Sequence, residues 1–183
     1  KNEVSFLNQI HATSEHTWAL VLSLIRKIPQ AFESVRENNW DRDIFKGSEL
    51  SGKTLGIIGL GRIGKKVANF GRHFGMKVVT YSLEPSDSYS GIKFLNTMEE
   101  VFQISNIVSI HLPLEPETIK VIGKDQFSAI EKPIILVNTS RGEIVDEKAF
   151  LSALNAGKIS AAAVDVLEGE NDIDFPHNSK LIA

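Results

Sequence analysis

The feature that most constrains the fold is a set of three glycines, Gly59, Gly61 and Gly64, spaced as G-x-G-x-x-G. The motif directly follows a short apolar run, residues 54–58, and opens an amphipathic stretch that continues to Phe74. A buried strand, a glycine turn and a helix in that order form the setting in which this motif binds the pyrophosphate of a dinucleotide. The alternative, an ordinary strand-to-helix turn, explains the spacing but gives the glycines no task.

Each position of the motif has its own task in a dinucleotide site. Gly59 permits the tight turn, Gly61 lets a phosphate approach the backbone, and Gly64 allows the helix to pack close to the strand. Arg62 and Ile63 lie in the first helical turn, whose free N–H groups and dipole attract phosphate oxygens. These five residues are therefore the predicted pyrophosphate-binding residues.

The chain around the motif alternates between apolar runs and helical patterns. Expected strands cover residues 54–58, 76–81, 106–112, 133–138 and 161–166. Expected helices cover residues 62–74, a short segment after the capping pair Thr97 and Glu100, and residues 147–154 after the capping residue Asp146. Such alternation predicts a parallel sheet wrapped by helices, which is the doubly wound α/β class of the Rossmann type.

An apolar stripe near the start of the chain predicts one further helix. Its members recur at helical spacing: Trp18, Val21, Leu22 and Ile25. We expect this helix to begin at Thr13, with Thr13 or Ser14 as the N-cap, and to extend to about Ile28, with Pro29 limiting its far end. Its wide apolar face is explained either by packing on the sheet of the same chain or by contact with a second copy.

A polar stretch, residues 36–52, separates this helix from the alternating part and has no clear periodicity. We interpret it as an irregular arm, in which Trp40 is available to anchor the arm to either subunit. The chain is therefore divided into an N-terminal helix with its connecting arm, residues 1–52, and a Rossmann dinucleotide-binding core, residues 53–183.

The net charge and the absence of cysteine exclude several kinds of binding partner and several kinds of site. The 20 Lys and Arg residues against 23 Asp and Glu residues give a net charge of −3, without the basic excess that a nucleic acid backbone requires. The absence of cysteine excludes disulfides, cysteine nucleophiles and zinc–thiolate sites, and we expect no metal site. No apolar run approaches the roughly 20 residues of a membrane helix. We expect a soluble, cytoplasmic domain whose partner is a small molecule, neither a nucleic acid nor a membrane.

A group that binds the adenosine ribose is expected about 20 residues past the glycine motif. Ser82 and Glu84 both lie at about that distance, just after the second expected strand. Either Glu84 accepts hydrogen bonds from the ribose hydroxyls, or Ser82 contacts them and the preference for NAD over NADP is relaxed. No arginine directly follows Ser82 to receive a 2′-phosphate, which favours NAD and leaves NADP open.

Four motifs together resemble the NAD-binding domain of the D-isomer-specific 2-hydroxyacid dehydrogenases, a family that includes phosphoglycerate dehydrogenase. The motifs occur in the order of the family: residues 11–17 (HATSEHT), 52–64 (GKTLGIIGLGRIG), 111–118 (HLPLEPET) and 137–142 (VNTSRG). The resemblance extends from about His11 to Glu170. It implies an NAD-dependent oxidoreductase that transfers a hydride between NAD(H) and a D-2-hydroxy acid or its 2-keto acid.

The resemblance implies two catalytic residues. Arg141 matches the arginine that binds the substrate carboxylate, and a planar guanidinium suits bidentate binding of that group. Glu170 matches the glutamate that hydrogen-bonds to a catalytic histidine, although Asn171 stands where the family usually has proline. Without the flanking motifs, Arg141 would be interpreted as a surface arginine and Glu170 as part of an acidic loop.

The resemblance also implies residues along the nicotinamide half of the cofactor: His111, Pro113, Thr139 and Asp165. His177 follows Glu170 too soon to be the acid/base histidine of the family, and we interpret His16 as a structural residue of the first helix. We therefore expect the histidine segment and the substrate domain to lie outside this chain. The chain alone is expected to bind NAD and to turn over little or nothing.

Two other functions stay open from the sequence. One is a non-catalytic scaffold resembling the corepressors that share this fold, in which NAD(H) binding would favour dimerisation and recruitment of partners. The other is an interaction domain with a degenerate fold that binds no NAD. Family members commonly pair through their cofactor domains, so the resemblance also implies a homodimer.

Overall fold

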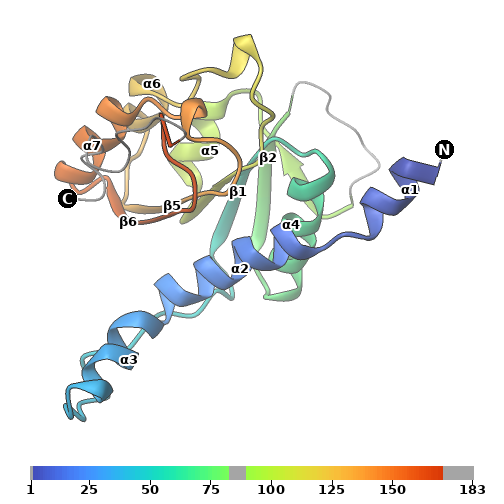
Figure 1. Cartoon of the computed structure of the whole chain (residues 1–183). Coiled ribbons are helices and arrows are strands. Elements are labelled where there is room, and N and C mark those ends of the chain that lie inside the picture. Colours follow the sequence, from blue (N-terminus) through green and yellow to red (C-terminus); the bar gives the residue numbers. More distant parts are fainter. Residues whose placement is uncertain (1, 83–89, 171–183) are drawn as a thin grey trace.

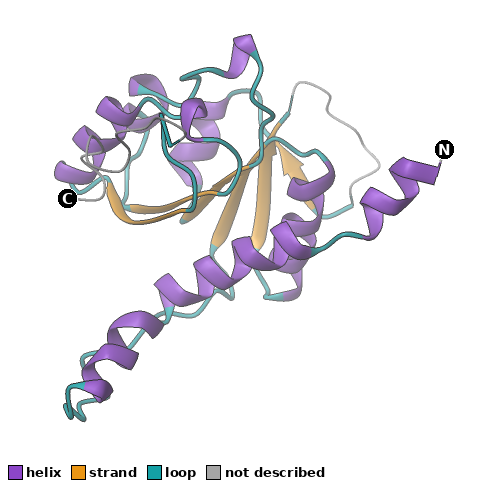
Figure 2. Ribbon diagram, viewed as in Figure 1, coloured by secondary structure: helices purple, strands orange, loops and turns teal. Residues whose placement is uncertain are grey.

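A six-stranded parallel sheet forms the centre of the computed structural model, which describes residues 2–82 and 90–170 (Figures 1 and 2). Its strands are β1 Thr54–Ile58, β2 Lys77–Tyr81, β3 Ile92–Phe94, β4 Ile107–Ile110, β5 Ile134–Asn138 and β6 Ile159–Val164. Their order across the sheet is β3-β2-β1-β4-β5-β6, with every pairing parallel. The predicted doubly wound α/β fold is confirmed.

The direction of winding reverses between β1 and β4. Chain segments that leave the carboxyl ends of these two neighbouring strands therefore turn to opposite faces of the sheet. In open α/β sheets, ligands bind in the crevice that opens at such a point. The topology thus directs attention to the segments that directly follow β1 and β4.

Helices cover both faces of the sheet (Figure 2). The helices of the described residues are α1 Asn2–Gln9, α2 Ala12–Ile25, α3 Ile28–Arg36, α4 Arg62–His73, α5 Met98–Ile104, α6 Lys124–Ser128 and α7 Glu147–Asn155, with short 3-10 turns at Pro116–Thr118 and Gly142–Ile144. Of these, α2 and α4 cover one face of the sheet, and α5, α6 and α7 cover the other. Leu55 and Ile57 of β1 pack with α2 and α4, whereas Ile58 packs in the cluster that contains α5, α6 and α7. All three side chains are fully buried, as expected of a strand covered on both faces.

The N-terminal helix differs from the prediction at both ends. No side chain caps α2, and the hydroxyl of Ser14 instead donates to the carbonyl of His11 at 2.7 Å. The helix ends at Ile25, because Lys27 adopts a left-handed backbone conformation with φ of 54°. Pro29 lies in the first turn of α3, where its missing N–H costs nothing. The predicted N-cap and the predicted end of the helix were therefore wrong.

Trp18 packs within its own chain. Only 5% of its surface is exposed, its indole N–H donates to the carbonyl of Val67 at 3.2 Å, and its ring lies 4.8 Å from that of Phe74. The tryptophan therefore joins α2 to α4, which leaves it unavailable for contact with a second copy.

Helix α3 extends away from the sheet at the end of α2 (Figure 1). Its apolar side chains are exposed: Ile28, Phe32 and Val35. Trp40, in the segment that follows, is 83% exposed. The apolar surface predicted near the N-terminus thus lies on α3 and the following segment and not on Trp18. Within the part of the chain that the structure describes, no helix is long and apolar enough to cross a membrane.

Candidate dinucleotide site

A cleft of about 800 Å³ lies at the carboxyl ends of β1, β4, β5 and β6. Four segments that are distant in the sequence meet there, one after each strand. Its lining residues are Thr13, Gly61, Arg62, Ile63, His111, Leu112, Pro113, Leu114, Thr139, Ser140, Arg141, Asp165 and Val166. The cleft therefore brings together most of the predicted cofactor residues and Arg141 at the point where the winding of the sheet reverses.

The three glycines of the motif have different surroundings. Gly59 has a positive φ of 94°, which side-chain-bearing residues rarely adopt. A Cβ atom at Gly64 would overlap the carbonyl oxygen of Gly59, so this glycine permits the close approach of α4 to the turn. A Cβ at Gly61 would meet no atom within 4 Å. Gly61 therefore faces open space in the cleft, as expected of a glycine that a phosphate approaches.

Helix α4 begins at the edge of this cleft. Its N-cap is Gly61, which offers no side chain to the first N–H groups of the helix. Arg62 lines the cleft and donates from its guanidinium to the carbonyl of Leu7 at 3.0 Å. The glycine turn and the uncapped helix end thus form a site with the chemistry that a pyrophosphate requires.

His111 follows β4 and lies in the cleft as a neutral ring. Its Nε2 contacts the hydroxyl of the buried Ser109 at 2.8 Å. Burial lowers the pKa of His111 from its ordinary value to about 4. An imidazole with this pKa holds no proton to donate near neutral pH, which fits a lining role and not that of the acid/base.

Arg141 lies at the tip of the turn that follows β5. The side chain of Asn138, which is buried, shapes this turn: its amide donates to the carbonyl of Arg141 at 2.9 Å and its oxygen accepts from the N–H and the hydroxyl of Ser140. The guanidinium of Arg141 is exposed and donates to the carbonyl of Ser140 at 2.6 Å. The sequence analysis did not identify Asn138. The sequence feature that could have identified this residue is a polar amide at the end of an otherwise apolar strand.

Gly142 places the next turn in direct contact with the loop after β6. A Cβ atom at Gly142 would overlap backbone atoms of Leu167 and Glu168. Within that loop, the carboxylate of Glu170 accepts from the N–H of Leu167 at 2.9 Å. The predicted catalytic glutamate is therefore folded over its own turn and does not line the cleft, although the loop that carries it touches the turn next to Arg141.

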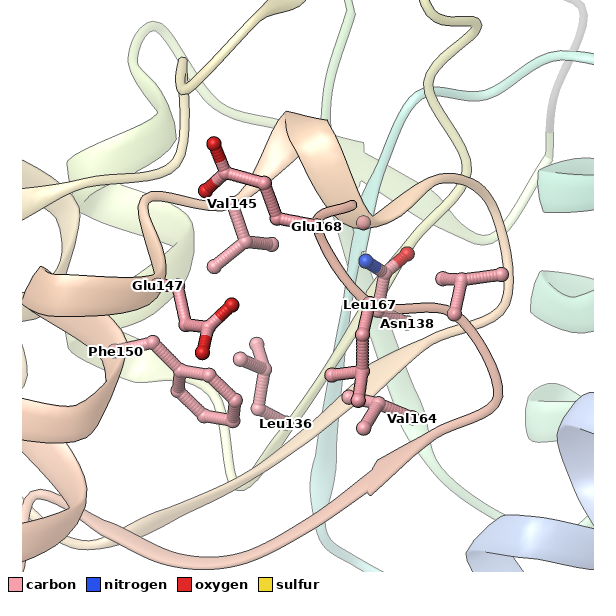
Figure 3. Close-up of a pocket in the computed structure, with 10 residues that line it drawn as sticks. Leu136, Asn138, Val145, Glu147, Phe150, Val164, Leu167 and Glu168 are labelled. Carbon is pink, nitrogen blue, oxygen red and sulfur yellow. The ribbon is translucent and has the colours of Figure 1, made fainter. Parts of the chain in front are cut away.

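A second cavity, of about 20 Å³, lies beneath the same loop (Figure 3). Figure 3 shows the carboxylates of Glu147 and Glu168 at its wall, above the ring of Phe150. Glu168 forms an ion pair with Lys120 at 2.8 Å, and this hydrogen bond is the main cause that raises the pKa of Lys120. The cavity has room for a water molecule and none for a cofactor.

The two residues predicted to bind the adenosine ribose are Ser82 and Glu84. Ser82 is half-buried directly after β2 and does not line the cleft. Glu84 and His177 lie outside the described residues. The choice between Ser82 and Glu84 therefore stays a prediction.

The first turns of α2 also reach the cleft, a contribution that the sequence analysis missed. Thr13 lines it, and the buried hydroxyl of Thr17 lies 2.9 Å from that of Thr139. Nε2 of His16 lies 3.0 Å from a carboxylate oxygen of Asp165. The sequence could have indicated this contribution, because the spacing of these three α2 residues places them on one face of the helix.

Comparison with known proteins decides the family. The model of the D-isomer specific 2-hydroxyacid dehydrogenase NAD-binding domain matches residues 18–183. The chain belongs to this family. The 2-hydroxyacid dehydrogenase fold thus accounts for the sheet, for the glycine turn and for the motifs that meet in the cleft.

Relatives of this NAD-binding domain are metabolic enzymes. D-3-phosphoglycerate dehydrogenase of Methanocaldococcus jannaschii is 42% identical over 169 residues, which cover 90% of this chain and 32% of that enzyme. The chain therefore spans about a third of the length of this curated relative. The relatives that we compare are dehydrogenases and reductases, which supports the enzyme interpretation over the corepressor-type scaffold.

Solved structures of the family superpose closely on the domain. D-lactate dehydrogenase from Aquifex aeolicus, complexed with NAD and lactic acid, has a TM-score of 0.82 at 34% identity, covering 87% of this chain and 48% of that one. An acyclic imino acid reductase in complex with NADPH and D-arginine has a TM-score of 0.82 at 32% identity, covering 90% of this chain and 53% of that one. Relatives of this domain thus bind either cofactor.

Proposed function

We propose that this chain is the NAD-binding domain of an oxidoreductase that transfers a hydride between NAD(H) and C2 of a D-2-hydroxy acid or 2-keto acid. The observation that carries the proposal is the cleft itself. It gathers the glycine turn, the segment after β4, the Arg141 turn and Asp165 around one space. Residues 1–52 are then the N-terminal helices and arm of this domain, and residues 53–183 its dinucleotide-binding core.

One group of residues binds the pyrophosphate of NAD, and another group binds its nicotinamide half. The pyrophosphate lies against Gly61 and the start of α4, where Arg62 adds a positive charge and Gly59 and Gly64 shape the turn. The nicotinamide half contacts four residues: His111, Pro113, Thr139 and Asp165. When bound, NAD supplies the acceptor for the hydride. Ser82 or Glu84 contacts the adenosine ribose, with NAD preferred and NADP tolerated.

Arg141 and Glu170 are the proposed catalytic residues. Arg141 exchanges its bond to the Ser140 carbonyl for a bidentate pair with the substrate carboxylate, an exchange that its exposed guanidinium permits. Glu170 releases the N–H of Leu167 and accepts from the acid/base histidine, which the parent enzyme supplies from another segment. Held by a carboxylate, that imidazole keeps its proton for transfer to the keto oxygen.

We also propose a cytoplasmic homodimer that pairs through the N-terminal part of this domain. The exposed apolar side chains of α3 support the pairing, because their burial against a second copy is energetically favourable. The absence of cysteine fits a reducing compartment.

Calorimetry on the chain tests cofactor binding. We expect NAD to bind, and NADP to bind more weakly, without measurable turnover of 2-keto acids. Absence of NAD binding would contradict the proposal. Robust turnover by the chain alone would contradict the expectation that the acid/base histidine lies elsewhere.

Arg141→Lys in the parent enzyme tests the substrate role. We expect kcat/KM for the 2-keto acid to fall about 100-fold, because lysine keeps the charge but loses the bidentate geometry. The dissociation constant of NAD should stay unchanged. Lys124→Arg, on the exposed start of α6 away from the cleft, is a matched control and should change neither quantity. An unaltered kcat/KM in the Arg141 variant would contradict the assignment.

A further inference from the structure

One face of α2 is part of the wall of the cleft. Thr13 lines the cleft, and His16 and Thr17, three and four positions later, reach residues that also line it. Positions with this spacing lie on the same side of a helix. The first turns of α2 therefore contact the cofactor site through three side chains, although these turns precede the glycine motif by some forty residues of chain.

Thr17 fixes the direction of the Thr139 hydroxyl. Thr17 is fully buried, and its hydroxyl donates its single proton to the carbonyl of Thr13 at 2.8 Å. The contact of 2.9 Å between the two threonine hydroxyls therefore takes its proton from Thr139. Thr139 is thus held as a hydrogen-bond donor to α2, and its remaining lone pairs make it an acceptor for a group in the cleft.

His16 holds the second residue, Asp165. The 3.0 Å contact joins Nε2 of His16 to one oxygen of the Asp165 carboxylate. With its proton on Nε2, the imidazole donates a hydrogen bond to this oxygen. Both side chains are well exposed, which makes the pair weak as a source of stability and effective mainly in orienting the carboxylate.

We propose that His16 and Thr17 are positioning residues of the cofactor site, which hold Asp165 and Thr139 for the nicotinamide half. This inference rests on the proposed function, since it uses the assignment of those two residues to that half. The pyrophosphate half depends on the glycine turn and α4, which neither positioning residue contacts through a hydrogen bond. Loss of either positioning residue should therefore weaken binding of the nicotinamide end selectively.

Comparing NAD with ADP-ribose, which keeps both riboses and the pyrophosphate but lacks the nicotinamide ring, isolates the contacts made to that ring. We expect His16→Ala and Thr17→Val each to raise the dissociation constant of NAD about fivefold, the effect of one misplaced hydrogen-bonding partner, and to leave that of ADP-ribose unchanged. His16→Gln keeps an N–H at the position of Nε2, and Thr17→Ser keeps the hydroxyl. Both conservative variants should bind NAD with close to the wild-type affinity.

The outcomes distinguish this inference from the proposed function. If the wild-type chain binds both ligands but the two disruptive variants bind NAD normally, or lose affinity for both ligands equally, the positioning role is wrong. If the wild-type chain binds neither ligand, the proposed function fails and this inference fails with it. His16→Ala alters an exposed side chain, so its result does not depend on a change of the fold.

Discussion

Burial determines the chemistry of His111 more than its residue type does. A histidine in a candidate active-site cleft is a natural choice for proton transfer, yet the low pKa of this ring keeps it neutral throughout the physiological range. Its contact with Ser109 ties the ring to the buried strand β4. At this position the side chain therefore serves as a fixed, uncharged wall of the cleft.

The same pKa predicts a dependence of stability on pH. Between the ordinary value near 6.5 and about 4, the unfolded chain binds a proton at His111 that the folded chain does not. The stabilisation is therefore complete above the ordinary value and is lost as the pH falls toward the folded value. We expect His111→Gln to lose less unfolding free energy than the wild type between pH 7 and pH 4.5.

Urea denaturation at several pH values measures this difference. Carboxylates that titrate in the same range are common to both proteins and cancel in the comparison. Parallel curves for the two proteins would contradict the assignment of a neutral ring at His111.

Single residues were predictable where the backbone itself demands a residue type. Gly59 and Gly64 were identified because their tasks need the absence of a side chain. Asn138 and Thr17 were not, because their roles arise from contacts that only folding creates: the hydroxyl of Thr17 meets one that lies 122 positions along the chain. No local pattern encodes such a contact.

At the scale of elements, two glycines of the same turn have different expected roles. Gly64 is needed for the fold, and Gly61 faces the ligand. Gly64→Ala places a Cβ against the carbonyl of Gly59 and should destabilise the fold by about 1–3 kcal/mol. Gly61→Ala meets no neighbour and has an ordinary φ of −74°, so its stability should stay within about 0.5 kcal/mol of the wild type. Its affinity for NAD should nevertheless fall about tenfold, because the added methyl group occupies the path of the phosphate.

Thermal denaturation and NAD titration of the two variants form a matched pair. Each variant serves as the control for the other, since both add one methyl group within the same turn. The assignment would be contradicted if Gly61→Ala unfolded at a much lower temperature, or if it bound NAD as tightly as the wild type.

Helices and strands with a clear apolar pattern or a capping residue were predicted from the sequence. Those that depend on contacts with the rest of the fold were not. Strands β1, β4 and β5 are short, mostly apolar and largely buried, and Asp146 caps α7 through the N–H of Ala149 as expected. Strand β3 has only three residues and pairs with β2 alone, so it leaves little trace in the sequence. Helix α3 was missed because Pro29, which was expected to end one helix, begins another.

At the scale of the whole molecule, the fold class followed from the alternation of elements, whereas the location of the exposed apolar surface that we propose for pairing did not. Trp18 was a candidate for that surface and is buried against α4. The exposed apolar side chains lie instead on α3, which extends from the body of the domain. Periodicity identifies an apolar face but does not tell which neighbour covers it.

Dimerisation through α3 is therefore testable with one added charge. Phe32 is 60% exposed, and we expect Phe32→Glu to convert a dimer into a monomer in light scattering. Gln30→Glu adds the same charge to an exposed position two residues earlier, on a different face of α3, and should leave the dimer intact. A wild-type chain that is monomeric at every concentration would contradict the homodimer.

The contact at Gly142 has a consequence for how the site moves. Because backbone meets backbone there, without a side chain between them, neither the turn that carries Arg141 nor the loop that carries Glu170 has room to shift toward the other. A movement of either segment toward the other would therefore push the other away. If Arg141 binds the substrate as proposed, a shift of its turn toward the glutamate loop should therefore displace that loop as well.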